Sequence, residues 1–91
     1  MTQRAEDEVV EICRDLIRID TTNPGDNSGP GERVAAEYVA GLLAEVGVEP
    51  VILESAPKRA SLVARIPGTD QTRPALMIDG HLDVVDRKSV V

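Results

Sequence analysis

The segment Ala75-Leu-Met-Ile-Asp-Gly-His-Leu-Asp-Val-Val85 decides the predicted fold, because in it a short apolar run leads directly to the single histidine of the chain. Residues 75–78 predict a strand, since turn-forming residues bound this apolar run on both sides. If the chain stays extended beyond it, His81 and Asp83 project to the same face, because side chains alternate along a strand. We therefore expect an imidazole and a carboxylate to meet at the carboxyl end of a strand, where active sites of open α/β sheets collect.

Two helices are predicted upstream of this segment. Apolar residues spaced by three and four predict a first helix from Thr2, its candidate N-cap, to about residue 19. The same spacing predicts a second helix over about 30–46, and Gly47 fits a left-handed cap that ends it.

The connector over residues 20–31 consists almost wholly of turn formers and helix breakers. Its glycines invite comparison with a phosphate-binding loop, but the Gly-Lys-Ser/Thr ending is absent and no strand precedes it. The sequence favours a plain connector in which Ser28 or a neighbouring polar group caps the following helix.

Two further strands are predicted between the second helix and the histidine. They span residues 51–53 and 61–66, and residues 56–59 between them are few enough for a hairpin turn. The order helix, helix, strand, strand, strand predicts an α/β or α+β layer.

The composition restricts the size and class of the protein. Ninety-one residues, 42% hydrophobic and 29% charged, suffice for one small domain at most. The net charge of −6 and the absence of Phe and Trp disfavour nucleic acid and membrane surfaces as partners. No membrane span or secretory signal is recognised, so a cytoplasmic location is expected. Cys13, the single cysteine, lies on the apolar stripe of the first helix and is expected to be a buried structural thiol.

Two roles are open to the histidine and its neighbour. His81 could bind a metal ion through one ring nitrogen, while Asp83 orients the ring by accepting a hydrogen bond from the other. The alternative is a surface histidine beside a carboxylate, because His-x-Asp is a common triplet. A catalytic zinc site takes about three protein ligands, and the chain has one His and one Cys. If His81 is a metal ligand, the residues of this chain therefore supply only part of a metal site.

Several motifs together resemble one enzyme family. They are Leu-Ile-Arg-Ile-Asp-Thr-Thr-Asn-Pro-Gly (16–25), Gly31-Glu32, Leu43-x-x-Val46-Gly47, Ser-Leu-Val-Ala-Arg-Ile-Pro-Gly (61–68) and Gly-His-Leu-Asp-Val-Val (80–85). In order and spacing they are similar to the N-terminal part of the di-zinc metallopeptidases and amidohydrolases that include aminoacylase, acetylornithine deacetylase and succinyl-diaminopimelate desuccinylase. The resemblance covers about residues 5–85.

This resemblance implies a fold, an activity and site residues. The fold would be the N-terminal part, two helices and about three strands, of a zinc-peptidase-like three-layer α/β/α catalytic domain over residues 1–85. The activity would be hydrolysis of amide bonds in small peptides or N-acyl amino acids by zinc-activated water. Two zinc ions, or cobalt in their place, would serve a full-length protein that could be a homodimer. His81 resembles the first zinc ligand, and Asp83 the catalytic-site aspartate that orients it.

The general base and the other ligands of the family are absent from the 91 residues, so the chain alone is expected to be inactive. Residues 86–91 also depart from the family, which nearly always has Pro after Asp-Val-Val. A widely used sequencing adapter read in frame encodes these six residues, so we expect a non-native tail. Two alternatives stay open: a small acidic, non-catalytic binding module that uses its helical faces, and a half-site that recruits a second chain.

Overall fold

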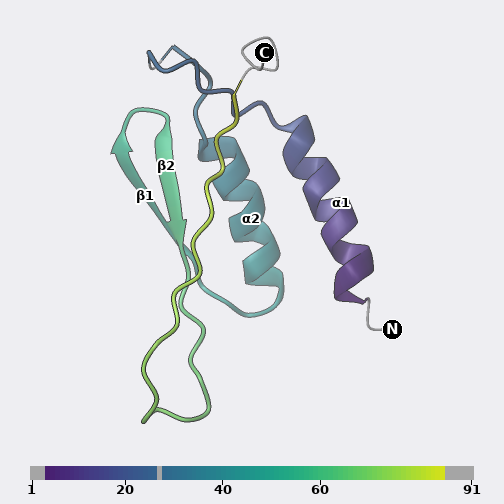
Figure 1. Ribbon diagram of the computed structural model, residues 1–91, viewed down its shortest axis with the longest axis vertical. Helices are drawn as coiled ribbons and strands as arrows, with labels where there is room; N and C mark the ends of the chain where they lie inside the picture. Colours follow the sequence, from purple (N-terminus) through teal and green to yellow (C-terminus); the bar gives the residue numbers. More distant parts are fainter. Residues whose placement is uncertain (1–3, 27, 86–91) are drawn as a thin grey trace.

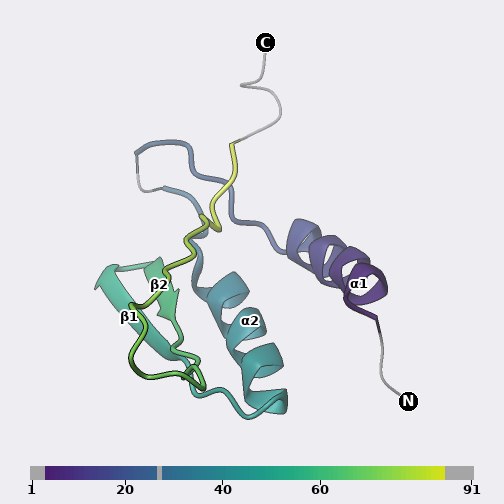
Figure 2. The same cartoon turned by 60° about the horizontal axis from the view of Figure 1, so that its bottom comes forward.

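The chain forms a small α/β unit of two helices and two strands. The computed structural model describes residues 4–26 and 28–85. Helix α1 spans Ala5–Arg18, helix α2 Arg33–Glu45, strand β1 Val51–Ala56 and strand β2 Arg59–Val63. In both Figure 1 and Figure 2, α2 lies between α1 and the two strands. The predicted cap Thr2 and the predicted tail at 86–91 lie outside the described residues.

Both predicted helices are present, with shorter bounds. Three acidic residues in the first turn of α1 complement the positive end of its dipole, and Arg4 occupies the N-cap position. Helix α2 begins after Glu32, and no side chain caps it, so the cap predicted at or near Ser28 is wrong. No helix in the described residues is both long and apolar enough to cross a membrane.

Gly47 ends α2 as predicted. It has φ +81°, which an L side chain rarely adopts. Its amide donates to the carbonyl of Ala44 at 3.1 Å, and the amide of Val48 donates to the carbonyl of Leu43 at 3.0 Å. These two bonds satisfy the carbonyl groups of the last helical turn in a Schellman arrangement.

The predicted hairpin is confirmed. Strands β1 and β2 pair antiparallel, with Val51 opposite Val63. The turn between them consists of Pro57 and Lys58, and Lys58 has a φ of 69°. Proline suits the first corner of such a turn because its ring fixes φ.

The predicted third strand is absent from the described residues. Residues 75–78 carry no regular secondary structure, and their side chains Leu76, Met77 and Ile78 are 86–89% exposed. An apolar run becomes a strand only when another strand pairs with it, and the sheet of the described residues contains β1 and β2 alone. The expectation of about three strands is therefore wrong here, and the layers observed are two helices and a two-stranded sheet.

The described core is small and lies where α2 packs on the hairpin. Ala35 and Ala36 of α2 and Ala60 of β2 are at most 7% exposed. Methyl side chains let the helix approach the sheet closely, but they bury little apolar area.

Helix α1 contributes no buried residue. Cys13 is exposed, so the prediction of a buried thiol is wrong. The physical reason is that the apolar stripe of α1 is covered only in part: Ile12 and Leu16 are half-buried, whereas Cys13 is exposed. The Tyr38 hydroxyl of α2 donates to Asp15 of α1 at 2.7 Å.

The chain leaves more surface in water than a self-contained domain does. Its accessible area is 7886 Å² at a mass of 9.8 kDa, whereas a compact protein of this mass exposes about 5,200 Å². Its radius of gyration is 15.4 Å, compared with about 12 Å for a compact chain of this length. Apolar surface that a complete core would cover therefore stays open.

Candidate functional site

The segment around His81 is fastened to the loop that precedes α2. Thr22 and Val84 form a parallel β-bridge. The amide of Val84 donates to the carbonyl of Thr21 at 3.1 Å, and the Thr21 hydroxyl donates to the carbonyl of Leu82 at 2.8 Å. Thr21 is only 4% exposed. The region is therefore held by long-range hydrogen bonds although no regular strand runs through it.

His81 and Asp83 lie together, as the extended geometry predicts. His81 Nδ1 lies 2.8 Å from the backbone carbonyl oxygen of Asp83 and 3.1 Å from its Oδ1. A carbonyl and an ionised carboxylate only accept hydrogen bonds, so Nδ1 must carry the proton. The neutral ring therefore keeps its free lone pair on Nε2, the nitrogen that a metal ion would use. The His81 side chain is 84% exposed, so this nitrogen can be reached.

The titration of both groups follows from these contacts. Hydrogen bonds to the backbone and then to the side chain of Asp83 raise the pKa of His81. A hydrogen bond from Asn23 is the main cause that lowers the pKa of Asp83, and the bond from His81 adds to it. Asp83 is thus ionised at neutral pH and remains an acceptor for the imidazole.

Asn23 is a site residue that sequence reasoning missed. Its Nδ2 donates to Asp83 Oδ2 at 2.9 Å across 60 residues of chain. The sequence predicts Asn23 only as a turn former in a connector. No local pattern connects it with Asp83, because the contact depends on how the loop and the later segment pack.

A hollow of 350 Å³ adjoins His81, and its lining includes Glu32, to which the Gly31-Glu32 motif in the sequence assigns no site role. The hollow is lined by Glu32, Val39, 60–62 and 79–83. Glu32 is 7% exposed, and its Oε1 lies 3.1 Å from an Arg59 guanidinium nitrogen. Its other oxygen, Oε2, is buried without a hydrogen-bond partner among the described residues. The lining of the hollow therefore includes an imidazole and carboxylate groups.

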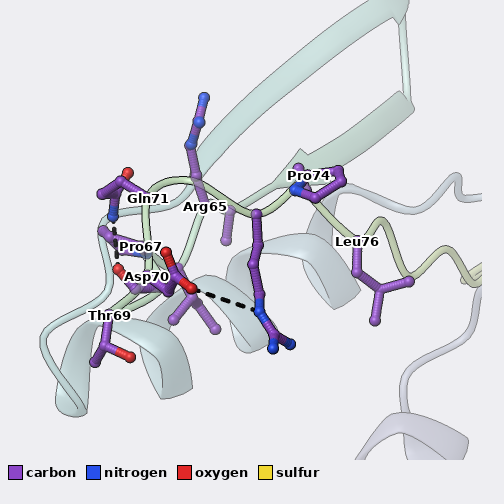
Figure 3. Close-up of a pocket in the computed structure, with 12 residues that line it drawn as sticks. Arg65, Pro67, Thr69, Asp70, Gln71, Pro74 and Leu76 are labelled. Atoms are coloured by element: carbon purple, nitrogen blue, oxygen red, sulfur yellow. Dashed lines mark hydrogen bonds and ion pairs between the residues drawn. The ribbon is translucent and has the colours of Figure 1, made fainter.

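A wider hollow of 740 Å³ lies in the loop over residues 64–76 and is shown in Figure 3. Asp70 pairs with Arg73 at 3.5 Å, and Gln71 Nε2 donates to the carbonyl of Gly68 at 2.6 Å. The residues that line it are all exposed, and none of the predicted site residues is among them. This hollow is therefore a feature of the loop and not of the His81 site.

The described residues supply one side chain suited to bind a metal ion, but they do not supply a complete metal site. His81 offers Nε2 with its ring held by Asp83, the arrangement usual for a metal-binding histidine. Within residues 4–26 and 28–85, however, no group of three or more His, Cys, Asp or Glu side chains could hold an ion. A complete site would need further donors.

Comparison with known proteins shows that the chain is distantly related to a curated protein. The chain is similar to a succinyl-diaminopimelate desuccinylase. Two strains of Staphylococcus epidermidis each have a protein named probable succinyl-diaminopimelate desuccinylase that is 33% identical over 86 residues, or 94% of this chain. The chain spans about a fifth of the length of these curated relatives, 19% in each case. No protein-family model matches the chain, and no solved structure matches it.

Proposed function

We propose that residues 1–85 form the N-terminal part of the catalytic domain of a metal-dependent amidohydrolase. Its substrates are small peptides or N-acyl amino acids, and its metal is zinc or cobalt. The similarity over 86 residues to proteins named as desuccinylases supports an acyl-amino-acid substrate. In this proposal His81 is a metal ligand and Asp83 is the residue that orients it.

The hydrogen bond between His81 Nδ1 and Asp83 Oδ1, at 3.1 Å, carries the proposal. It leaves Nε2 unprotonated in the neutral ring, which is the form a metal ion requires. A carboxylate on Nδ1 also raises the basicity of the ligand nitrogen and prevents rotation of the ring.

Zinc, when bound, lowers the pKa of its water ligand and polarises an amide carbonyl. The chain's own contribution is to present one nitrogen donor in a fixed orientation. Further donors and a general base lie outside the described residues in this proposal. We therefore expect the purified 91-residue chain to hydrolyse no N-acyl amino acid, even with added zinc. Hydrolysis that depends on His81 in such a sample would contradict this.

The test is a chimera in which residues 1–85 replace the aligned segment of the Staphylococcus epidermidis relative. We expect the chimera to bind zinc and to hydrolyse an N-succinyl amino acid. His81→Ala should abolish hydrolysis and lower the zinc content, and Asp83→Asn should weaken zinc binding by about 10–100-fold. Glu49→Gln is the matched control, because this carboxylate is exposed and is not among the residues that line the His81 hollow. Full zinc content and activity in the His81→Ala chimera would refute the proposal.

A second candidate is an acidic binding module. It is favoured by Val9, Val10 and Ile17 of α1, which are 54–78% exposed and would suit an apolar partner surface. A monomer that unfolds in one sharp thermal transition would favour this candidate, because it would show that the chain is self-contained.

A further inference from the structure

The side-chain amide of Asn23 has a defined orientation. Its Nδ2 donates to Asp83 Oδ2 at 2.9 Å, and its Oδ1 accepts from the backbone amide of Gly25 at 3.0 Å. Because the oxygen end faces an N–H donor, the NH₂ end must face the carboxylate. Asn23 therefore donates to Asp83 without bringing a charge to the site.

The backbone that carries this amide is also held. The amide of Asn23 donates to the carbonyl of Val84 at 2.8 Å, and the Thr21 hydroxyl donates to the carbonyl of Leu82 at 2.8 Å. These bonds fasten the chain on both sides of Asp83. The Asn23 side chain thus approaches Asp83 from a fixed position.

The two oxygens of Asp83 have different partners. Oδ2 accepts from Asn23, while Oδ1 lies 3.1 Å from His81 Nδ1. The same ring nitrogen also lies 2.8 Å from the backbone carbonyl oxygen of Asp83, so the carboxylate adds to a contact that the backbone makes. The terminal torsion of an aspartate is broad and roughly two-fold, so a bond to one oxygen determines where the other points. Asn23 therefore affects the hydrogen bond to the His81 imidazole by orienting the Asp83 carboxylate.

We propose that Asn23 is a positioning residue, which holds the Asp83 carboxylate so that its other oxygen keeps the His81 ring with Nδ1 protonated and Nε2 free. The use of Nε2 for a metal ion rests on the proposed function. The relay Asn23–Asp83–His81 itself needs no metal, so the two proposals are tested separately: the relay by the histidine tautomer, and the function by zinc binding in the chimera.

The experiment is ¹⁵N NMR of the neutral imidazole in the full 91-residue chain. His81 is its only histidine, so one pair of ring nitrogens reports the tautomer. We expect Asn23→Ala to lower the ratio of the Nδ1–H to the Nε2–H tautomer about threefold, an effect in the lower part of the range for one hydrogen bond. Asp26→Ala is the loop control, because Asp26 accepts from Ser28 in the same loop. It should leave the ratio unchanged.

A double-mutant cycle separates positioning from general loosening of the loop. In an Asp83→Ala background, Asn23→Ala should have no further effect on the tautomer ratio, because the relay is already broken. Asn23→Asp keeps the shape of the side chain and the acceptor for Gly25, and it should lower the ratio at least as much as Asn23→Ala. The proposal is overturned if Asn23→Ala leaves the ratio unchanged, or if it lowers the ratio equally in the Asp83→Ala background.

Discussion

Replacing Gly31 by alanine should loosen the contact between the start of α2 and the hairpin turn. Gly31 has φ +81°, and a Cβ there would overlap the carbonyl oxygen of Lys58. That oxygen also accepts the amide hydrogen of Glu32 at 3.0 Å. Gly47→Ala is the matched control, because Gly47 has the same φ of +81° and a Cβ there would meet nothing within 4 Å. The two variants share the backbone strain and differ in the overlap with the turn.

The strain common to both variants is about 1–2 kcal/mol for an L-residue in this conformation. It is offset by about 0.4–1 kcal/mol, because alanine restricts the unfolded chain more than glycine does. In Gly31→Ala the overlap is with backbone, so the turn must move away. That movement breaks the Glu32–Lys58 hydrogen bond, at about 1 kcal/mol, and draws Arg59 away from Glu32, at about another 1 kcal/mol. We expect a loss of about 1 kcal/mol for Gly47→Ala and about 3 kcal/mol for Gly31→Ala.

Hydrogen exchange of the Glu32 amide measures this difference, because exchange requires the bond to Lys58 to open. A difference of about 2 kcal/mol corresponds to exchange about 30-fold faster in Gly31→Ala than in Gly47→Ala. Equal exchange rates in the two variants would refute the reasoning, since they would show that the turn does not pack on Gly31.

Three further predictions follow from other contacts. The bond from Tyr38 to Asp15 raises the pKa of Tyr38 to about 12, so Asp15→Asn should return that pKa toward 10 in an ultraviolet titration of the chain's single tyrosine. Because the folded-state pKa is raised, the stabilisation by this bond is present below pH 10 and is lost as the pH rises toward about 12; an unchanged titration in Asp15→Asn would disprove the contact. Arg59→Met leaves the buried Glu32 carboxylate without its partner and should lower the free energy of unfolding in urea by about 1–3 kcal/mol. Adding Glu32→Gln should recover part of that loss, and a double variant no more stable than Arg59→Met would argue against a role for the pair. Finally, the open apolar surface should bind a hydrophobic dye and drive association as concentration rises in sedimentation experiments, whereas a dye-silent monomer with a sharp thermal transition would contradict this.

Features with a local cause were predictable from the sequence. Gly47 ends α2 because a left-handed residue is needed there, and the four residues at 56–59 permit a hairpin whatever surrounds them. The proximity of His81 and Asp83 also follows from an extended backbone over three residues. Each of these depends on neighbours close in sequence.

Features that depend on distant partners were not predictable. The apolar run at 75–78 has the pattern of a strand but no paired neighbour among the described residues. Cys13 has the pattern of a buried residue, but it is exposed because the apolar face of α1 is covered only in part. The contact from Asn23 to Asp83 spans 60 residues. In each case the outcome depends on packing between residues distant in sequence, and the periodicity of the residues does not show which of them pack together.

Forming the bridge between Thr22 and Val84 brings together two distant parts of the chain, and this lowers the conformational entropy of the residues between them. Thr21 and Leu82, joined within it, are 61 positions apart. For a flexible chain, the length-dependent part of the entropy cost of closing a loop of that length is about 3.6 kcal/mol. The four hydrogen bonds between residues 21–23 and 82–84 contribute about 4 kcal/mol in total, at a typical 1 kcal/mol each. The orientation of the imidazole is therefore set by a near balance, so small changes anywhere in the intervening helix and hairpin will alter the fraction of molecules in which the site is assembled.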